Sequence, residues 1–222
     1  MTAPAYLTRL RISRAPSARA LIQFMLPRDG AARVASSHRL LWTLFGDDAE
    51  RRRDFLWREE GKGQFLLLSR RPPEDHHRLF EMQPPKPFAP ALTAGDRLRF
   101  ALRVNATIRR NGDPHRRDVV MDAIHALPPG ERAVARRAAE QTASRAWLDR
   151  QGTAHGFAVR EAACLGYETL SIPHRGGDMQ LGVLDLEGVI EVTDPARLMP
   201  KLLDGFGRAR AFGHGLMLIA PA

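Results

Sequence analysis

The stretch that divides this chain reads Met82-Gln83-Pro84-Pro85-Lys86-Pro87-Phe88-Ala89-Pro90-Ala91. It holds four prolines in ten residues. Proline fixes φ and lacks the N–H that a helix or a central strand needs, so the stretch is predicted to be a linker. It separates an N-terminal half, residues 1–83, from a C-terminal half, residues 95–222, and each half is long enough for a small domain.

The N-terminal half shows a repeating alternation of strand and helix signals. A Gly61-Lys62-Gly63 turn between two apolar runs is typical of a β-hairpin, and Gly46 is placed to end the first helix. The expected elements are a strand at 6–12, a helix at about 33–45, strands at 54–59 and 64–69, a short helix near 75–79 and a last strand.

The C-terminal half repeats this order with larger insertions. Asp194-Pro195 marks a helix start, with Asp as the N-cap and Pro at the first helical position. The expected elements are a strand at 97–104, an irregular basic stretch or hairpin to 117, a helix at 130–150, strands near 156–163 and 180–192, a helix from 195 and a strand at 216–219. The sequence therefore predicts an α+β protein of two tandem ferredoxin-like βαββαβ domains, the arrangement of RNA-recognition motifs.

The composition favours a globular protein with an anionic partner. The formal net charge is +9 and the pI is about 10.9, which suits binding to a polyanion. Only three of the 34 basic residues are lysine, a bias that a GC-rich genome also produces. Hydrophobic residues make up 44% of the chain, enough for a core and too many for wholesale disorder.

Several classes of site are disfavoured by the sequence. The single Cys164 excludes an internal disulfide and a multi-cysteine zinc site. His76 and His77 are adjacent, and on a helix they project about 100° apart, which does not suit one shared ion. We expect no metal and no cofactor. No apolar run approaches the length of a membrane span, and no signal peptide is visible. We therefore expect a soluble cytoplasmic protein.

A glycine-rich loop precedes the last expected strand. Residues 205–215 contain four glycines and two arginines. Glycine permits positive φ and close approach of a ligand, successive amides can form an anion-binding concavity, and arginine pairs well with phosphate. The alternative is a plain connection with tight turns. The pattern matches neither a Walker loop nor a Rossmann loop, and we favour contact with a polyanion.

His38 and a basic run are the other candidates. On the expected helix, His38 falls at the edge of the apolar arc. It is either a border histidine or a partly sheltered imidazole placed for proton transfer. Residues 105–117 resemble an exposed charged loop or hairpin, which would either be a solvated surface or contact phosphates without reading bases.

Taken in order, these pieces resemble the CasE family, the CRISPR RNA-processing endoribonuclease subunit of Cascade complexes. The resemblance covers almost the whole chain, and the glycine loop ending in Gly213-His214-Gly215-Leu216 is its strongest part. The other matching segments are Tyr6-Leu7-Thr8-Arg9-Leu10, His38-Arg39-Leu40-Leu41-Trp42-Thr43-Leu44-Phe45, Asp54-Phe55-Leu56-Trp57-Arg58, the 84–92 linker, Leu98-Arg99-Phe100 with Leu102-Arg103 and Asn105, and Leu186-Glu187-Gly188.

The resemblance implies metal-independent cleavage of CRISPR repeat RNA at the 3′ base of its hairpin. The family's catalytic histidine corresponds to His38, in the N-terminal domain. Known members often carry a tyrosine three residues earlier, where this chain has Ala35. Either Ser36, Ser37 or a residue of the second half assists instead, or His38 acts with less help.

The implied reaction is attack of a ribose 2′-hydroxyl on the adjacent phosphate, which leaves a 2′,3′-cyclic phosphate and a 5′-hydroxyl. His38 would act as general base or general acid, worth roughly 10²–10⁴-fold. The residues expected to contact RNA are Arg39, Arg103, Asn105, Arg109, Arg110, Arg116, Arg117, Gly205, Gly207, Arg208, Arg210, Gly213 and Gly215.

The expected partners are the CRISPR repeat RNA hairpin and other Cascade subunits, with no membrane and a monomer when isolated. Two alternatives remain at this point. One is a non-catalytic hairpin-RNA-binding subunit of a CRISPR effector complex. The other is a DNA-binding regulator, which is disfavoured because no helix-turn-helix spacing is present.

Overall fold

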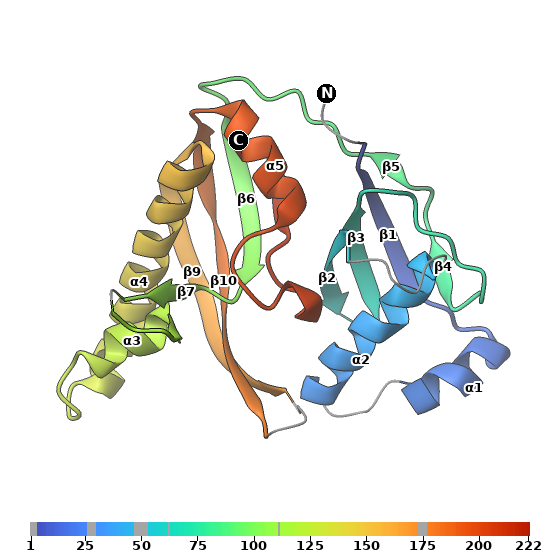
Figure 1. Cartoon of the computed structure of the whole chain (residues 1–222), viewed down its shortest axis with the longest axis horizontal. Helices are drawn as coiled ribbons and strands as arrows, with labels where there is room; N and C mark the ends of the chain where they lie inside the picture. Colours follow the sequence, from blue (N-terminus) through green and yellow to red (C-terminus); the bar gives the residue numbers. More distant parts are fainter. Residues whose placement is uncertain (1–3, 26–29, 47–52, 62, 111, 173–176) are drawn as a thin grey trace.

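The computed structural model describes residues 4–25, 30–46, 53–61, 63–110, 112–172 and 177–222 of the 222-residue chain. Two antiparallel sheets, one from each half of the sequence, lie on either side of helix α5 (Pro195–Asp204) (Figure 1). The Pro-rich linker runs along one end of the molecule from the first sheet to the second.

The N-terminal half forms a five-stranded sheet with two helices on one face (Figure 1). Its elements are β1 (Tyr6–Ile12), α1 (Pro16–Met25), α2 (Gly30–Trp42), the 3₁₀ turn η1 (Thr43–Phe45), β2 (Phe55–Gly61), β3 (Gln64–Ser69), β4 (Phe80–Met82) and β5 (Lys86–Pro87). The strand order is β2-β3-β1-β4, and β5 also pairs with β1. Apolar residues of α2, among them Leu40 and Leu41, are fully buried in the same core as Trp57 and Leu67 of the sheet.

Three expectations for this half are corrected. The short helix near 75–79 is absent, because the Asp75 carboxylate accepts the N–H groups of Leu79 and Phe80 and holds a turn there. Helix α1 was not expected from the sequence. Helix α2 ends at Trp42 and continues as η1, and Gly46 follows with a φ of −76°, so it is not a left-handed cap.

The C-terminal half forms a four-stranded sheet in the order β11-β6-β10-β9. Its elements are β6 (Arg97–Val104), β7 (Thr107–Arg109), β8 (Arg116–Asp118), α3 (Val119–His125), α4 (Arg132–His155), β9 (Phe157–Ile172), β10 (Met179–Val192), α5, the 3₁₀ turn η2 (Arg210–Phe212) and β11 (Met217–Pro221). The fourth, first, third and second main strands lie in that order, as they do in the N-terminal sheet. The predicted tandem ferredoxin-like fold is confirmed.

Local expectations for this half succeed where capping chemistry is clear. The Asp194 carboxylate accepts from the N–H groups of Ala196 and Arg197, and Pro195 opens α5 as predicted. The basic stretch forms the β7–β8 hairpin. Helix α3 was not expected, and β9 continues to Ile172, well past the predicted end at 163, because it pairs with β10 along almost its whole length.

Apolar contacts join the two halves. Leu56 and Leu68 of the first sheet belong to one buried cluster with Leu203 of α5 and Leu216. Burying such side chains contributes about 1.5–3 kcal/mol each. Strand β5 extends the first sheet to Pro87. The domain boundaries expected at 83 and 95 stay a prediction.

Candidate active site and nucleic-acid interface

His38 lies on α2 beside two aromatic rings. Its Nε2 accepts a hydrogen bond from Trp42 Nε1–H at 3.1 Å. The i, i+4 spacing places these two side chains on one face of the helix. The Phe55 ring lies 5.9 Å from the imidazole, centroid to centroid. The imidazole is therefore held on two sides and is only partly open to solvent.

The Trp42 contact also indicates which ring nitrogen of His38 carries the proton. A neutral imidazole has one donor and one acceptor nitrogen, and the hydrogen bond of one determines the role of the other. Because Nε2 accepts from Trp42, Nδ1 carries the hydrogen. His38 Nδ1 is buried and has no hydrogen-bond partner among the described residues. The lone pair that can take part in proton transfer is therefore on Nε2.

The His38 imidazole is neutral at physiological pH. Burial, and secondly the positive charge of Arg53, lower the pKa of His38 from 6.5 to about 4. Both causes disfavour the imidazolium form. In this state the side chain is suited to accept a proton.

Arg53 lies just before β2 and is a residue that sequence reasoning missed. It is half-buried, and its buried Nη1 has no hydrogen-bond partner in the described structure. Within the described parts of the chain, no carboxylate forms an ion pair with it. Burial, followed by the positive charge of Arg210, lowers the pKa of Arg53. A partly buried guanidinium without an anion is costly, which indicates an anionic ligand.

The glycine loop, residues 205–215, brings Arg210 to this place from the other half of the chain. Trp57 Nε1–H of β2 donates to the carbonyl of Ala211 at 3.2 Å. Gly213 lies against the Trp57 ring so closely that a Cβ there would be 2.8 Å away. Turn η2, which carries Arg210, contacts both α2 and β2 (Figure 1). The loop is thus packed onto the half that carries His38.

All four predicted glycines have the positive φ that the sequence suggested, at 80°, 65°, 80° and 92° for Gly205, Gly207, Gly213 and Gly215. Their expected use as phosphate-binding amides needs correction for two of them. The N–H of Gly205 donates to the Lys201 carbonyl, and that of Gly215 to the Arg103 carbonyl, each within the protein. These two glycines shape the loop.

The side chains of Asn105 and Arg103 also form contacts within the protein. Asn105 is 4% exposed, its Nδ2–H donates to the Gly182 carbonyl at 2.7 Å, and its own carbonyl accepts from Arg208 N–H. Arg103 forms ion pairs with Asp185 and Glu168. Both side chains thus have partners within the protein, and their contact with RNA stays a prediction. Asn105 anchors the glycine loop, and the charge of Arg103 is already balanced.

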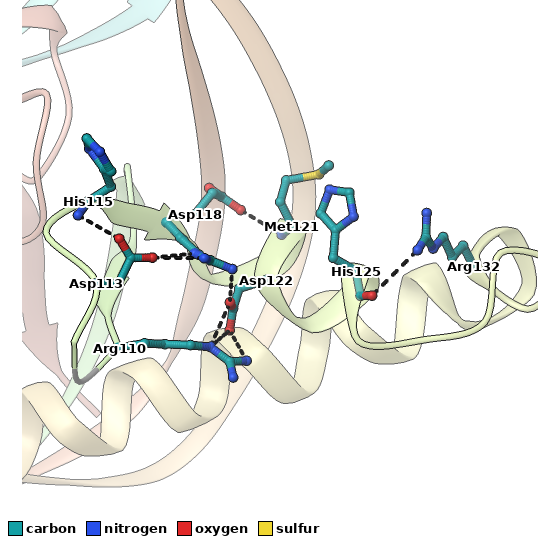
Figure 2. Close-up of polar contacts among 9 residues, drawn as sticks. Arg110, Asp113, His115, Asp118, Met121, Asp122, His125 and Arg132 are labelled. Atoms are coloured by element: carbon teal, nitrogen blue, oxygen red, sulfur yellow. Dashed lines mark hydrogen bonds and ion pairs between the residues drawn. The ribbon is translucent and has the colours of Figure 1, made fainter.

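Of the four arginines of the β7–β8 hairpin, two form ion pairs with aspartates and two form none within the described residues. Figure 2 shows Arg110 bound to Asp122, with contacts as short as 2.8 Å, and Asp113 is paired with Arg117, also at 2.8 Å. The other two, Arg109 and Arg116, have exposed side chains and form no ion pair within the described residues.

Arg109 and Arg116 occupy directly opposite positions on β7 and β8. Like charges opposite each other destabilise a strand pair unless an anion lies between them. Both line a groove of about 550 Å³, together with Arg208 of the glycine loop. The groove therefore brings together four of the predicted RNA contacts, these three arginines and Asn105, from two separate segments.

The remaining predicted residues lie on α2. Arg39 is exposed and its Nη2–H donates to Ser36 Oγ at 3.0 Å. Ser36 and Ser37 are 3% and 0% exposed, so the expectation that one of them replaces the family's tyrosine is corrected. Ala35 has no polar atom in its side chain. From the second half of the chain, the charge of Arg210 acts on Arg53, and the charge of Arg53 acts on His38.

Trp42 and Arg53 are the two site residues that sequence reasoning did not assign. The i, i+4 spacing of His38 and Trp42 was available in the sequence as a signal for side-chain contact. For Arg53, no local pattern distinguishes it from the 30 other arginines. In the described part of the chain, no group of three or more His, Cys, Asp or Glu side chains is placed to hold a metal ion, and no helix is long and apolar enough to span a membrane.

The fold and the site define a class of protein. Its members have two tandem ferredoxin-like domains, a histidine where the glycine loop meets α2, and a basic groove. The chain belongs to the CRISPR-associated protein family, whose model matches residues 5–221. A curated relative is the CRISPR-associated endoribonuclease Cse3 of Thermus thermophilus, 33% identical over 150 residues. That alignment covers 62% of this chain and 62% of the length of the relative.

Solved structures extend the similarity over the whole chain. A Cse3 endoribonuclease bound to a 19-nucleotide RNA is 28% identical, with a TM-score of 0.72 and full coverage of both chains. Thermus thermophilus Cse3 with an RNA that represents a pre-cleavage complex is 27% identical, with a TM-score of 0.70, and the match covers 98% of this chain and 100% of that one. Cas6e of Escherichia coli K-12, 23% identical with a TM-score of 0.63 over 98% of this chain and 100% of that one, shares the fold.

Proposed function

We propose that this protein is a metal-independent endoribonuclease that cuts CRISPR repeat RNA at the 3′ base of the repeat hairpin and so produces mature CRISPR RNA. One observation carries the proposal: a neutral, partly buried imidazole, His38, lies beside Arg53, which has no counter-charge among the described residues, where the glycine loop meets α2. A proton acceptor next to an anion site is what transfer of a phosphate ester to a neighbouring hydroxyl requires.

The RNA supplies its own nucleophile in this reaction. The 2′-oxygen forms a bond to the adjacent phosphorus, and the bond from phosphorus to the 5′-oxygen of the next nucleotide breaks. His38 Nε2 takes the proton of the 2′-hydroxyl, and the leaving 5′-oxygen takes a proton from water. The products are a 2′,3′-cyclic phosphate and a 5′-hydroxyl. Because nucleophile and target are already in one molecule, the protein mainly orients them and stabilises charge.

Trp42 prepares His38 for the role of general base. By donating to Nε2, it keeps the ring hydrogen on Nδ1 and the lone pair on Nε2. The 2′-hydroxyl would replace the indole N–H as the donor to that lone pair. His38 Nδ1 is buried, which makes Nε2 the nitrogen for this exchange.

The groove lined by Arg109, Arg116 and Arg208 is the proposed contact for the RNA stem. Base edges are poorly accessible in the deep, narrow major groove of A-form RNA, so contacts to phosphates would position the stem mainly by its shape. The Cse3 structures with bound RNA support this assignment by similarity. By the same reasoning, the proposed partners are the repeat hairpin and other subunits of a Cascade complex.

Incubation with labelled repeat RNA from the same genome in EDTA tests the proposal. We expect one discrete product that ends in a cyclic phosphate, and no product from RNA with a 2′-deoxyribose just upstream of the scissile phosphate. Cleavage of the deoxy substrate would contradict attack by the 2′-hydroxyl.

The second candidate is a non-catalytic subunit that binds the hairpin. Ala35 and the burial of both neighbouring serines favour it, because they leave His38 without a hydroxyl partner from this part of α2. Tight binding of the hairpin without cleavage, with or without added divalent ions, would select this candidate.

A further inference from the structure

Arg53 is a partly buried cation without a compensating anion among the described residues. It lies two residues before β2, and its Nη1 is enclosed there without an acceptor among the described residues. Two other arginines of this region are paired with carboxylates. Arg71 is paired with Asp54 at 3.1 Å, and Arg70 is paired with Asp204 at 2.8 Å. Arg53 takes part in neither pair.

The charges around Arg53 add to the deficit of anions. Arg210 approaches it from η2, and Lys201 of α5 lies near Arg210. The Arg210 Nη1–H donates to a main-chain carbonyl, that of Asp204, which does not balance its positive charge. The Asp204 carboxylate itself is engaged by Arg70. Two guanidinium groups from different halves of the chain therefore lie close enough for the charge of one to act on the other, and Arg53 in turn acts on His38.

The glycine loop fixes this arrangement. The hydrogen bond from Trp57 to Ala211 and the close contact of Gly213 with the Trp57 ring hold η2 onto β2. Arg53 precedes β2 by two residues. The strand that follows Arg53 is therefore the same strand that holds η2, the turn that carries Arg210. Like charges held together at a cost point to a ligand with at least one negative charge.

We propose that Arg53 and Arg210 bind the non-bridging oxygens of the scissile phosphate beside His38, and that Arg53 stabilises the additional negative charge of the pentacoordinate transition state. This inference rests on the proposed function and assigns a catalytic role to a residue outside the predicted site. The scissile phosphate carries one negative charge in the ground state and two in the dianionic transition state, once the 2′-hydroxyl has lost its proton. A guanidinium binds the second state more strongly.

Single-turnover cleavage with the full-length protein tests the catalytic role. Arg53→Gln is expected to lower the rate by about 10²–10³-fold, and Arg53→Lys should recover part of it. The affinity for repeat RNA blocked by a 2′-deoxyribose should change far less. The control is Arg11→Gln, which removes an exposed arginine paired with Glu81 on the first sheet. A rate for Arg53→Gln within threefold of the wild type would overturn the proposal.

Phosphorothioate substitution separates contact with the phosphate from a structural effect. A phosphorothioate has two diastereomers, each with sulfur in place of one non-bridging oxygen. Sulfur at the oxygen that Arg53 binds should slow cleavage by the wild type. In Arg53→Gln, this slowing should disappear for that diastereomer and not for the other. An equal change for both diastereomers would overturn the contact. Thermal melts of Arg53→Lys and Arg53→Gln report on folding, and if Arg53→Gln does not fold, the same diastereomer comparison is made with Arg53→Lys.

A binding experiment keeps this inference separate from the proposed function. In 2′-deoxy-blocked RNA, a neutral methylphosphonate replaces the scissile phosphate. The wild type should bind the phosphate form more tightly than the methylphosphonate form, and the Arg53→Gln, Arg210→Gln double variant should bind both alike. If the wild type does not cleave any repeat RNA, the proposed function fails, and this comparison still decides whether Arg53 and Arg210 together bind the phosphate. Equal binding of the two RNAs by the wild type would overturn it.

Discussion

The indole nitrogen of Trp42 donates a hydrogen bond to Nε2 of His38, one helical turn away, at 3.1 Å. This contact determines more than the position of the ring. It makes Nε2 the acceptor and leaves the hydrogen on the buried Nδ1. Together with the pKa lowered to about 4 by burial and by Arg53, it prepares a neutral base before any RNA is bound.

His38→Ala should lower the single-turnover cleavage rate by about 10²–10⁴-fold, the contribution of general base catalysis. The affinity for repeat RNA should change little, because the imidazole is neutral and partly buried. Gel-shift affinities measured beside cleavage rates check both parts. His76→Ala, on an exposed side chain near Glu74, is the matched control. A His38→Ala protein that cleaves within a few-fold of the wild type would rule out the assignment.

Trp42→Phe should keep the aromatic packing and lose the hydrogen bond to His38. The loss of one such bond removes about 0.5–1.5 kcal/mol of the preference for the tautomer with hydrogen on Nδ1, so cleavage should fall roughly two- to twelvefold. The specific signature is a shift of the His38 ¹⁵N resonances towards a mixture of the two neutral tautomers. Unchanged ¹⁵N resonances would show that Trp42 does not select the tautomer.

The pH dependence of kcat/KM should follow the pKa of His38 in the free protein. A general base acts in its neutral form, so the rate should be level from neutral pH down to about pH 5 and then decrease as the pH approaches about 4. A general acid acts in its protonated form and would show the opposite sign, with a rate that decreases tenfold per pH unit above about pH 4. Circular dichroism at each pH confirms that the protein stays folded.

The hairpin arginines should separate by their ion pairs. Arg116→Gln should weaken RNA binding and reduce the slope of log K against log salt by about 0.7–0.9 for each lost phosphate contact. Arg117→Gln removes an equal charge from the same strand, yet Arg117 is already bound to Asp113, so its effect should be smaller. A salt titration of both variants compares them directly. Identical slopes for the two would argue against the groove as the phosphate contact.

Gly213→Ala should destabilise the protein more than Gly95→Ala. Both glycines have positive φ, at 80° and 95°, so both substitutions incur a backbone cost of about 1–3 kcal/mol. Only at Gly213 does the new Cβ meet the Trp57 ring, at 2.8 Å, whereas nothing lies within 4 Å at Gly95. Thermal melts measure the difference, and the displaced loop should also slow cleavage by Gly213→Ala. Equal melting temperatures with unchanged cleavage would mean that the loop only connects α5 to β11.

Secondary structure was predictable where local chemistry is explicit. The four prolines of the 82–91 stretch indicated the division into two halves, and Asp194-Pro195 indicated the start of α5. The alternation of apolar residues predicted β6 with its observed bounds. The short helix near 75–79 was wrong because the Asp75 side chain bonds backbone N–H groups and competes with helix formation there.

The site was predictable only in part. Position on α2 and resemblance to a family pointed to His38, and glycine content indicated positive φ in the loop, but both are properties of single segments. Which arginines are neutralised depends on carboxylates that folding brings near, such as Asp122 for Arg110 and Asp185 for Arg103. No periodicity in the sequence encodes such pairing between distant segments.

The sequence by itself determined the two-domain fold, the helix that carries His38 and the loop that bends at its glycines, because hydrophobic pattern, capping and φ preference act over short segments. Only the tertiary structure decided that the charge of Arg210 acts on Arg53 and that of Arg53 on His38, and that Trp42 selects the tautomer of the imidazole. These properties depend on distance, burial and the balance of nearby charges, which exist only once the two halves have packed on each other.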